Sequence, residues 1–193
     1  MGAGVIVILT LTYVWGIPEA GASLIDYLGY FTNQTSLLTS LVLIATGGIV
    51  LAGRVPPGWL VLARAVATSC MIIVGVIYNT LVPGTGSAPP WVSAILHIWF
   101  PALVVFDWLM VRDRCAVPWR RLWVVLPYPV VWLTVVLVRG ATDGWVPYGF
   151  LLPERGIVSL TLHVVGLLVA LIAAGALVWA ASRWRPVQEC LAP

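Results

Sequence analysis

The sequence predicts an all-α membrane protein, a six-transmembrane-helix bundle with both termini cytoplasmic. Composition carries this prediction: of the 193 residues, 61% are hydrophobic and 9% are charged, and the mean hydropathy is +1.03. Soluble domains contain about 25% charged residues, so this chain cannot cover itself with polar surface in water. A spanning helix needs about 20 apolar residues, so six spans and their connections fill a single integral membrane domain, residues 1–193.

Six apolar stretches, separated by segments rich in Pro, Gly and Arg, define the expected helices. They cover about residues 2–17, 30–52, 59–82, 91–111, 122–138 and 157–181. Pro and Gly dipeptides such as Pro56-Pro57 and Pro83-Gly84 mark the ends of neighbouring spans. After the first stretch, Ala20-Gly21-Ala22 has the form of a signal-peptidase site. Cleavage there would leave five spans without changing the orientation of the others.

Arginine positions set the expected orientation, because cytoplasmic loops retain positive charge. Arg139 and Arg155 fall on one side of the membrane, and the other eight arginines fall on the opposite side. These eight are Arg54, Arg64, Arg112, Arg114, Arg120, Arg121, Arg183 and Arg185. We therefore expect both termini in the cytoplasm. The use of Arg without Lys, with much Ala, Val and Gly, indicates a bacterial genome of high GC content, and hence the bacterial plasma membrane.

Charge and cysteine usage argue against two other kinds of site. The net charge is +3, and the basic residues are scattered singly or in pairs, so there is no basic stripe of the kind that nucleic-acid binding requires. Cys70, Cys115 and Cys190 form no CxxC motif and no ligand cluster. The sequence therefore predicts neither a metal site nor a disulfide framework.

Polar residues within the expected spans are costly in hydrocarbon and usually point into the bundle. One such set follows a single helical face of the second span: Thr32, Thr35, Ser36, Thr39, Ser40 and Gly47. A packing seam of small residues between helices is the simplest interpretation. Thr32 stands apart, because it lies at the outer mouth beside Asn33 and Gln34.

A second polar set converges on the outer half of the bundle. His97 lies six residues inside the fourth span, at a depth of about 9 Å, and His163 lies equally deep in the last span. Asn79 lies near the outer end of the third span, and Arg139 and Asp143 lie where the fifth span emerges. An interhelical hydrogen bond would explain each histidine alone, whereas a convergent set of ionisable groups favours a functional site.

Two further features concern backbone and charge. Pro101 follows His97 by four positions and cannot donate to the His97 carbonyl, so we expect a kink with a free acceptor beside the imidazole. Near the inner face, Arg64 and Asp107 lie at matching depths on the third and fourth spans. We expect them to form a buried structural ion pair, because a lone charge there would cost several kcal/mol.

Three stretches resemble one family of membrane proteins. Residues 30–34 read Tyr-Phe-Thr-Asn-Gln, residues 96–101 read Leu-His-Ile-Trp-Phe-Pro, and Arg139-Gly140 precedes Gly-Trp-Val-Pro-Tyr-Gly-Phe-Leu at residues 144–151. In sequence and order they are similar to the androgen-induced and androgen-dependent TFPI-regulating membrane proteins and their six-span bacterial relatives. The resemblance covers most of the chain from Gly29 onward.

This resemblance implies a multi-pass threonine hydrolase that cleaves fatty acid esters of hydroxy fatty acids, without a cofactor. The essential threonine and histidine of the family match Thr32 and His97. A threonine hydroxyl needs an adjacent base, and His97 is placed to supply it on the outer-leaflet side. We expect the bilayer to deliver the lipid ester.

Supporting roles fall to the remaining polar residues of the outer half. Asn79 or Gln34 would donate to the oxyanion, and Arg139 beside Asp143 would hold a lipid carboxylate. Tyr148 belongs to the interfacial aromatic residues, and His163 is assigned to packing around the site. Two alternatives stay open at this point. One is a haem or quinone protein with His97 and His163 as axial ligands; the other is a non-catalytic lipid-binding or transport protein.

Overall fold

The computed structural model describes residues 1–16, 23–84, 88–111 and 114–184, and the regular structure within these ranges is helical. Five segments are long and apolar enough to cross a membrane: Phe31–Leu51, Gly58–Leu81, Pro90–Met110, Trp119–Thr142 and Ile157–Ala181. Their ends lie within about four residues of the last five expected spans. The chain is therefore an all-helical protein with the helices of a multi-pass membrane protein.

Several of these segments are composites of shorter helices. The described elements are α1 (Gly2–Gly16), α2 (Leu24–Gly29), α3 (Phe31–Leu51), α4 (Gly58–Leu81), α5 (Pro90–Ala94), a π-helical turn η2 (Ile95–Trp99), α6 (Phe100–Met110), a 3₁₀ helix η3 (Trp119–Val125), α7 (Pro127–Thr142), the 3₁₀ turns η4 (Gly149–Leu151) and η5 (Pro153–Arg155), and α8 (Ile157–Ala181). The Pro90–Met110 segment joins α5, η2 and α6, and the Trp119–Thr142 segment joins η3 and α7.

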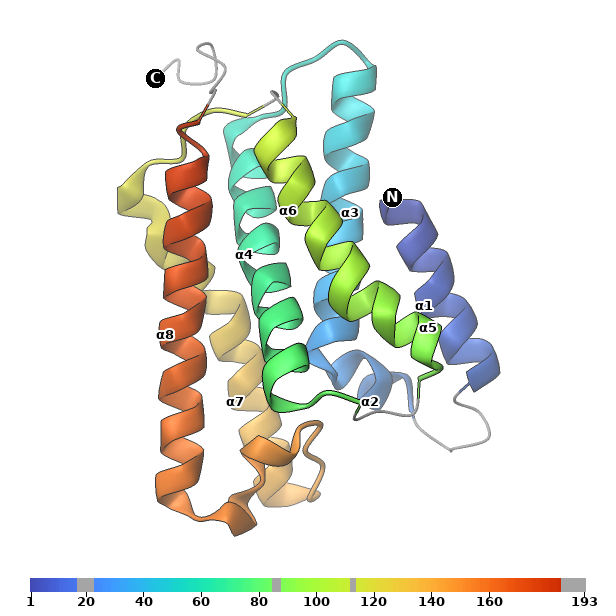
Figure 1. The fold of residues 1–193 in the computed structure, drawn as a ribbon, viewed down its shortest axis with the longest axis vertical. Helices are drawn as coiled ribbons and strands as arrows, with labels where there is room; N and C mark the ends of the chain where they lie inside the picture. Colours follow the sequence, from blue (N-terminus) through green and yellow to red (C-terminus); the bar gives the residue numbers. More distant parts are fainter. Residues whose placement is uncertain (17–22, 85–87, 112–113, 185–193) are drawn as a thin grey trace.

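Helix α1 differs from the other apolar helices in length. It has 15 residues, which at 1.5 Å per residue makes it about 22 Å long, shorter than the roughly 30 Å hydrocarbon core. It begins beside the middle of α3, where a Cβ on Gly2 would lie 2.7 Å from the Ser40 carbonyl oxygen (Figure 1). Helix length therefore establishes five candidate crossings. The Ala20-Gly21-Ala22 segment lies outside the described residues.

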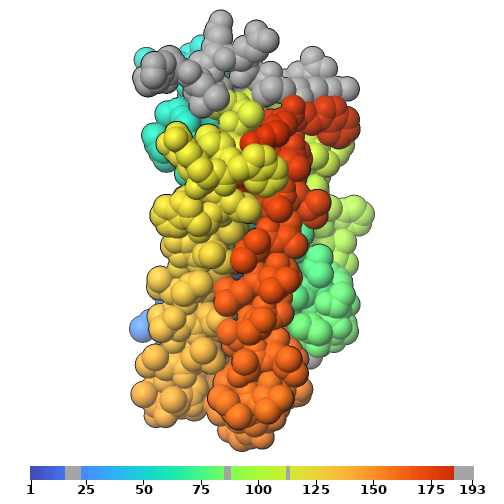
Figure 2. All heavy atoms as spheres, turned by 90° about the vertical axis from the view of Figure 1, so that its left-hand side faces the viewer, coloured from blue at the N-terminus to red at the C-terminus, as the bar shows by residue number. Residues whose placement is uncertain are grey.

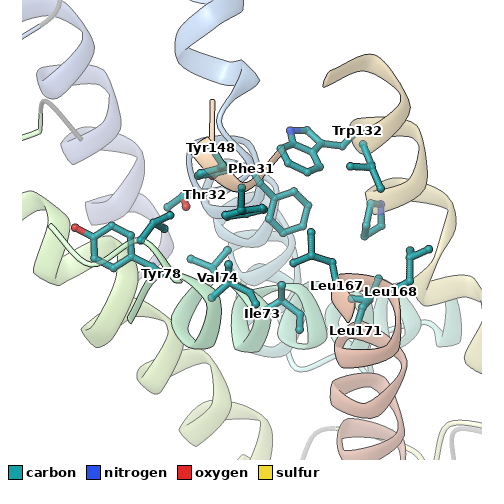
Figure 3. A pocket seen from close by; sticks show the side chains of 15 residues that line it. Phe31, Thr32, Ile73, Val74, Tyr78, Trp132, Tyr148, Leu167, Leu168 and Leu171 are labelled. Carbon is teal, nitrogen blue, oxygen red and sulfur yellow. The ribbon is translucent and has the colours of Figure 1, made fainter. Parts of the chain in front are cut away.

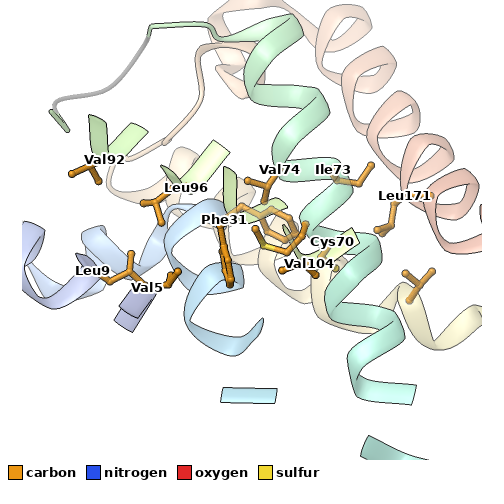
Figure 4. Close-up of a cluster of buried hydrophobic side chains, with 14 of the residues drawn as sticks. Val5, Leu9, Phe31, Cys70, Ile73, Val74, Val92, Leu96, Val104 and Leu171 are labelled. Carbon is orange, nitrogen blue, oxygen red and sulfur yellow. The ribbon is translucent and has the colours of Figure 1, made fainter. Parts of the chain in front are cut away.

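Helix α4 occupies the centre of the bundle and packs against α3, α6 and α8 (Figure 1). Its Ala65, Met71 and Cys70 side chains are almost completely buried. Side chains of α1, α3, α4, α5 and α8 meet in the main hydrophobic cluster, where Leu9 and Leu171 approach from opposite sides of α4 (Figure 4). This arrangement fixes the positions of the helices that surround the candidate site.

The outward faces of the helices are apolar. On α8, Leu162 and Leu177 are each 67% exposed and Val169 is 60% exposed. Figure 2 shows the elongated face that α8 forms with the segment from η3 to α7. Such a surface would be unfavourable in water but is stable against lipid chains, since the helices satisfy their own backbone hydrogen bonds.

The ion pair expected from the sequence is present at the end of the bundle where α4 begins and α6 ends. Arg64 Nη2 donates to Asp107 Oδ2 at 2.6 Å, and the Arg64 side chain is only 4% exposed. The guanidinium groups of Arg64 and Arg114 lie 5.7 Å and 4.9 Å from the Trp108 ring centre. The Trp108 indole in turn donates to the Val178 carbonyl of α8. These contacts tie α4, α6 and α8 together.

Candidate functional site: an apolar pocket at the start of α3

A pocket that is open on one side lies among α3, α4, α7 and α8 (Figure 3). Most of its lining is aliphatic or aromatic, and none of its lining residues is charged. Hydroxyl groups come from Thr32 on α3, Tyr78 on α4 and Tyr148 in the connection between α7 and α8. The pocket is thus mainly apolar with a few polar groups, which is typical of small-molecule sites.

Thr32 is the second residue of α3 and is 7% exposed. The first backbone N–H groups of a helix lack intrahelical acceptors, and the N-cap residue Tyr30 supplies no side-chain bond here. Tyr148, in the α7–α8 connection, lies beside this end of α3. Thr32 and Phe31 lie close enough to its hydroxyl to counteract part of the effect of burial on its pKa. Burial raises the pKa of Tyr148, so its hydroxyl keeps its proton at neutral pH.

Aromatic contacts hold the α7–α8 connection over the start of α3. Tyr148 stacks on Phe150 at 5.4 Å between ring centres, and Tyr30 meets Tyr148 edge-on at 6.0 Å. Trp145 meets Tyr30 edge-on at 5.9 Å. The Trp132 indole donates to the Gly29 carbonyl at 2.8 Å, just before α3 begins. Aromatic packing therefore helps to hold the connection over the start of α3.

His97 lies in the π-helical turn η2, which packs against α3. Its Nδ1 is 2.9 Å from the Ser93 carbonyl oxygen. A carbonyl only accepts, so we assign the proton to Nδ1, which makes Nε2 the acceptor of the neutral imidazole. The ring stacks on Tyr78 at 3.5 Å between ring centres, and the Tyr78 hydroxyl lies 2.6 Å from Ser93 Oγ. His97 thus lies behind one wall of the pocket and is not itself a lining residue.

The expected kink beside Pro101 takes the form of this π-helical turn, a feature often found at functional sites. The His97 carbonyl, to which Pro101 cannot donate, accepts from a side chain instead. The Asn79 amide donates to the His97 carbonyl at 3.2 Å and to the Gly75 carbonyl at 2.7 Å. Both amide hydrogens of Asn79 are therefore engaged, which corrects its expected role as an oxyanion donor. Gln34, the other expected donor, is not among the residues that line the pocket.

Arg139 also differs from its expected role as a ligand for a lipid carboxylate. Its Nη1 donates to Asp26 Oδ1 at 2.8 Å and its Nε donates to Asp143 Oδ2 at 2.9 Å. The guanidinium carbon lies 4.3 Å from the Trp145 ring centre. Two carboxylates already satisfy this cation, so it joins α2, α7 and the α7–α8 connection. The bond from Arg139 lowers the pKa of Asp26, and the backbone N–H of Trp145, followed by Arg139, lowers that of Asp143.

His163 repeats the arrangement of His97 on the other side of the pocket. Its Nδ1 lies 2.7 Å from the Ser159 carbonyl oxygen, and its ring stacks on Phe150 at 5.7 Å. Each imidazole therefore stacks on an aromatic residue that lines the pocket, and neither histidine lines it. Axial ligation of one haem by His97 and His163 does not fit this arrangement.

The sequence analysis missed two residues that organise the site. Tyr78 lies between His97 and the pocket, yet in sequence it is one of several aromatic residues near helix ends, which interfacial anchoring explains. Asp26 pairs with Arg139 across 113 positions. Its sequence signal was an isolated acid on the same expected side as Arg139, three positions after Ser23, whose hydroxyl caps α2.

Possible metal ligands and similarity to known proteins also bear on the site. Among the residues that the structure describes, no group of three or more His, Cys, Asp or Glu side chains is arranged to hold a metal ion. Comparison of the chain with protein-family models, with curated proteins and with solved structures gave no match.

Proposed function

We propose that this protein hydrolyses lipid esters inside the membrane, with Thr32 as the nucleophile and His97 as the general base. The observation that carries the proposal is the position of Thr32: its buried hydroxyl lies at the polar end of an otherwise apolar pocket. A lipid ester has the same division between a polar carbonyl and hydrocarbon. Figure 3 places the Thr32 oxygen on the side of the pocket that faces Tyr78, the ring on which His97 stacks.

The chemistry follows from the hydrogen bonds. With Nδ1 held by the Ser93 carbonyl, Nε2 accepts the proton of Thr32 as the threonine oxygen attacks the ester carbonyl. The alcohol leaves with a proton returned by His97, and the acyl group stays on Thr32. Water, activated by the same imidazole, then releases the carboxylic acid. Tyr148, whose hydroxyl is protonated and already contacts Thr32, is the best-placed donor to the oxyanion.

The wider assignment is part of the same proposal. It comprises membership of the androgen-induced and androgen-dependent TFPI-regulating family, six crossings with α1 as the first, cytoplasmic termini, and an outer-leaflet site in a bacterial plasma membrane. Three observations support it. Thr32 lines the pocket. His97 lies in a π-helical turn that ends two residues before Pro101, and the Trp145–Leu151 stretch covers the start of α3.

The test is covalent labelling of the purified protein with a fluorophosphonate, followed by mapping of the modified residue and ester hydrolysis assays. We expect labelling at Thr32, and loss of hydrolysis in Thr32→Ala and in His97→Ala. The double variant should be hardly worse than either, because residues that act as a unit are not additive. Thr32→Ser should keep some activity.

Matched controls are available on neighbouring helices. Thr134→Ala removes an exposed hydroxyl of α7 that bonds only its own helix, to the Val130 carbonyl, and should leave hydrolysis unchanged. His163→Ala removes the second imidazole that stacks on a lining residue and should lower activity less than His97→Ala. Full hydrolysis by the Thr32→Ala protein would reject the proposal.

Lipid binding without catalysis is the second candidate, and one observation favours it. His97 stacks behind Tyr78 rather than lining the pocket to which Thr32 contributes its hydroxyl. A binding protein would retain its affinity for a lipid ester in Thr32→Ala and would form no adduct at Thr32. The labelling experiment therefore separates the two functions.

A further inference from the structure

The lining of the pocket is asymmetric, with hydroxyl groups at one end and apolar side chains at the other. Its hydroxyls belong to Thr32 and Tyr78 near the outer ends of their helices and to Tyr148 in the connection above them. Figure 3 shows Thr32 and Tyr148 on one side, and Leu168 and Leu171 of α8 on the opposite side. The pocket therefore matches an amphiphile that enters with its polar group toward Thr32.

Chain direction identifies the deep end. Helix α4 runs toward the outer end, and its lining residues extend from Ile73 to Val82, nine positions and about 13 Å apart along the helix axis. Helix α8 runs the opposite way, so Leu171 is its deepest lining residue. Ile73 and Leu171 are 8% and 3% exposed and belong to the same core cluster. Together they form an apolar floor.

Charge decides which part of a lipid fits this space. The lining contains no Asp, Glu, Lys, Arg or His, and the Trp132 N–H is already donated to the Gly29 carbonyl. A carboxylate or headgroup charge placed at the floor would be buried without a partner, which is strongly unfavourable. An uncharged hydrocarbon chain has no such cost and gains from leaving water or the lipid interface.

We propose that the pocket binds the uncharged acyl chain of the lipid ester with its carbonyl beside Thr32 and its terminal methyl against Leu171 and Ile73, so that these two residues set the longest chain accepted. Any charged part of the substrate stays outside the pocket, on the far side of the ester bond. That the ligand is an ester rests on the proposed function, whereas the orientation of its acyl chain rests on the pocket alone.

The first test changes the floor and measures kcat/KM across esters with acyl chains of increasing length. Leu171→Phe should lower kcat/KM for the longest accepted chain about tenfold or more, since one methylene too many in a filled pocket costs that much. Butyryl esters, which do not reach the floor, should change less than about threefold. Leu171→Ala should move the optimum toward longer chains, which checks the same residue in the opposite direction. Equal effects on short and long chains would overturn the proposal.

The matched control lies on the same helix. Leu162 has the same side chain on α8 but is 67% exposed and faces away from the pocket. Leu162→Phe and Leu162→Ala should leave the chain-length profile unchanged. A shift of the optimum in the Leu162 variants as large as in the Leu171 variants would show that bulk on α8, rather than the floor, controls selectivity.

The second test needs no catalysis and separates this inference from the proposed function. Thr32→Ala protein in detergent is irradiated with two fatty acyl methyl esters, one carrying a diazirine at the terminal carbon and one carrying it next to the carbonyl. The terminal diazirine should label Leu171 or Ile73, and the other should label Tyr148 or its neighbours. Labelling of the floor together with full hydrolysis by Thr32→Ala would retain the inference and reject the catalytic assignment. Terminal labelling confined to exposed residues such as Leu162 would overturn the inference.

Discussion

A Cβ atom on Gly29 would lie 2.4 Å from Cη2 of the Trp145 indole, so this ring lies directly on the glycine. Gly29 ends α2 and is one residue from the start of α3, whereas Trp145 belongs to the α7–α8 connection. The contact joins segments more than 100 positions apart in the sequence and brings Tyr148 to the first turn of α3. Only glycine allows the indole to approach the backbone this closely.

Gly29→Ala is therefore expected to displace Trp145 and loosen the α7–α8 connection. Hydrogen exchange of residues 144–151 should become faster, and ester hydrolysis should fall with it, while the helices keep their protection. Gly47→Ala is the control, because a Cβ at Gly47 would meet nothing within 4 Å. Unchanged exchange in Gly29→Ala would mean that the indole is not held by this contact.

The Arg64–Asp107 ion pair predicts a strong asymmetry between single and double variants. Asp107→Ala removes the counter-charge of a guanidinium that is only 4% exposed, and should lower the free energy of unfolding by roughly 3 kcal/mol. Replacing both residues by Leu should recover much of this loss. Unfolding in a denaturing detergent would measure both. A double variant less stable than the sum of the single losses would argue against pairing, and Glu154→Ala at an exposed position serves as the control.

The ion pairs of Arg139 with Asp26 and Asp143 predict that acid destabilises the α7–α8 connection. In the folded protein the pKa values of Asp26 and Asp143 are both lowered, so their pairing with Arg139 stabilises fully above the unfolded-state value of about 3.9. This stabilisation is lost as the pH falls through the lower folded values. Hydrogen exchange of residues 144–151 should therefore quicken below about pH 4. In the Asp26→Asn, Asp143→Asn double variant, exchange should already be faster at pH 7 and should change little with acid.

The orientation of the chain is testable with single cysteines in a background without native cysteine. Arg120 and Glu154 are both exposed and lie at opposite ends of the bundle. Because eight of the ten arginines belong to the Arg120 side, a membrane-impermeant maleimide should label Glu154→Cys in intact cells and label Arg120→Cys only after lysis. The reverse result would invert the proposed topology.

The long helices of the bundle could be predicted from the sequence because hydropathy alone specifies them. The expected 157–181 span matches α8 at both ends, and the expected 59–82 span differs from α4 by one residue at each end. The segment that ends at Thr142 begins earlier than the expected 122–138 span, at Trp119, because a 3₁₀ helix precedes Pro127. How far α1 extends across the membrane depends on where it packs along α3, and hydropathy carries no information about that.

The candidate site could be predicted only in part. Depth along each span placed Arg64 opposite Asp107, and the spacing of Pro101 from His97 predicted a kink where the structure has a π-helical turn. Depth could not show that Tyr78 stacks on His97, because the two lie on different helices whose rotation is set by packing. Nor could it show that the carboxylates of Asp26 and Asp143 occupy Arg139, since the fold of the α7–α8 connection depends on contacts such as Trp145 with Gly29.

The pocket is built from two kinds of structure that tolerate change differently. Its walls belong to helices that also form the core around α4, so most substitutions there disturb the whole bundle. Its hydroxyl-bearing end lies beside a short connection between α7 and α8, and connections of this kind accept sequence change far more readily. Substitutions in residues 144–151 can therefore alter the polar end of the pocket while its apolar walls stay intact.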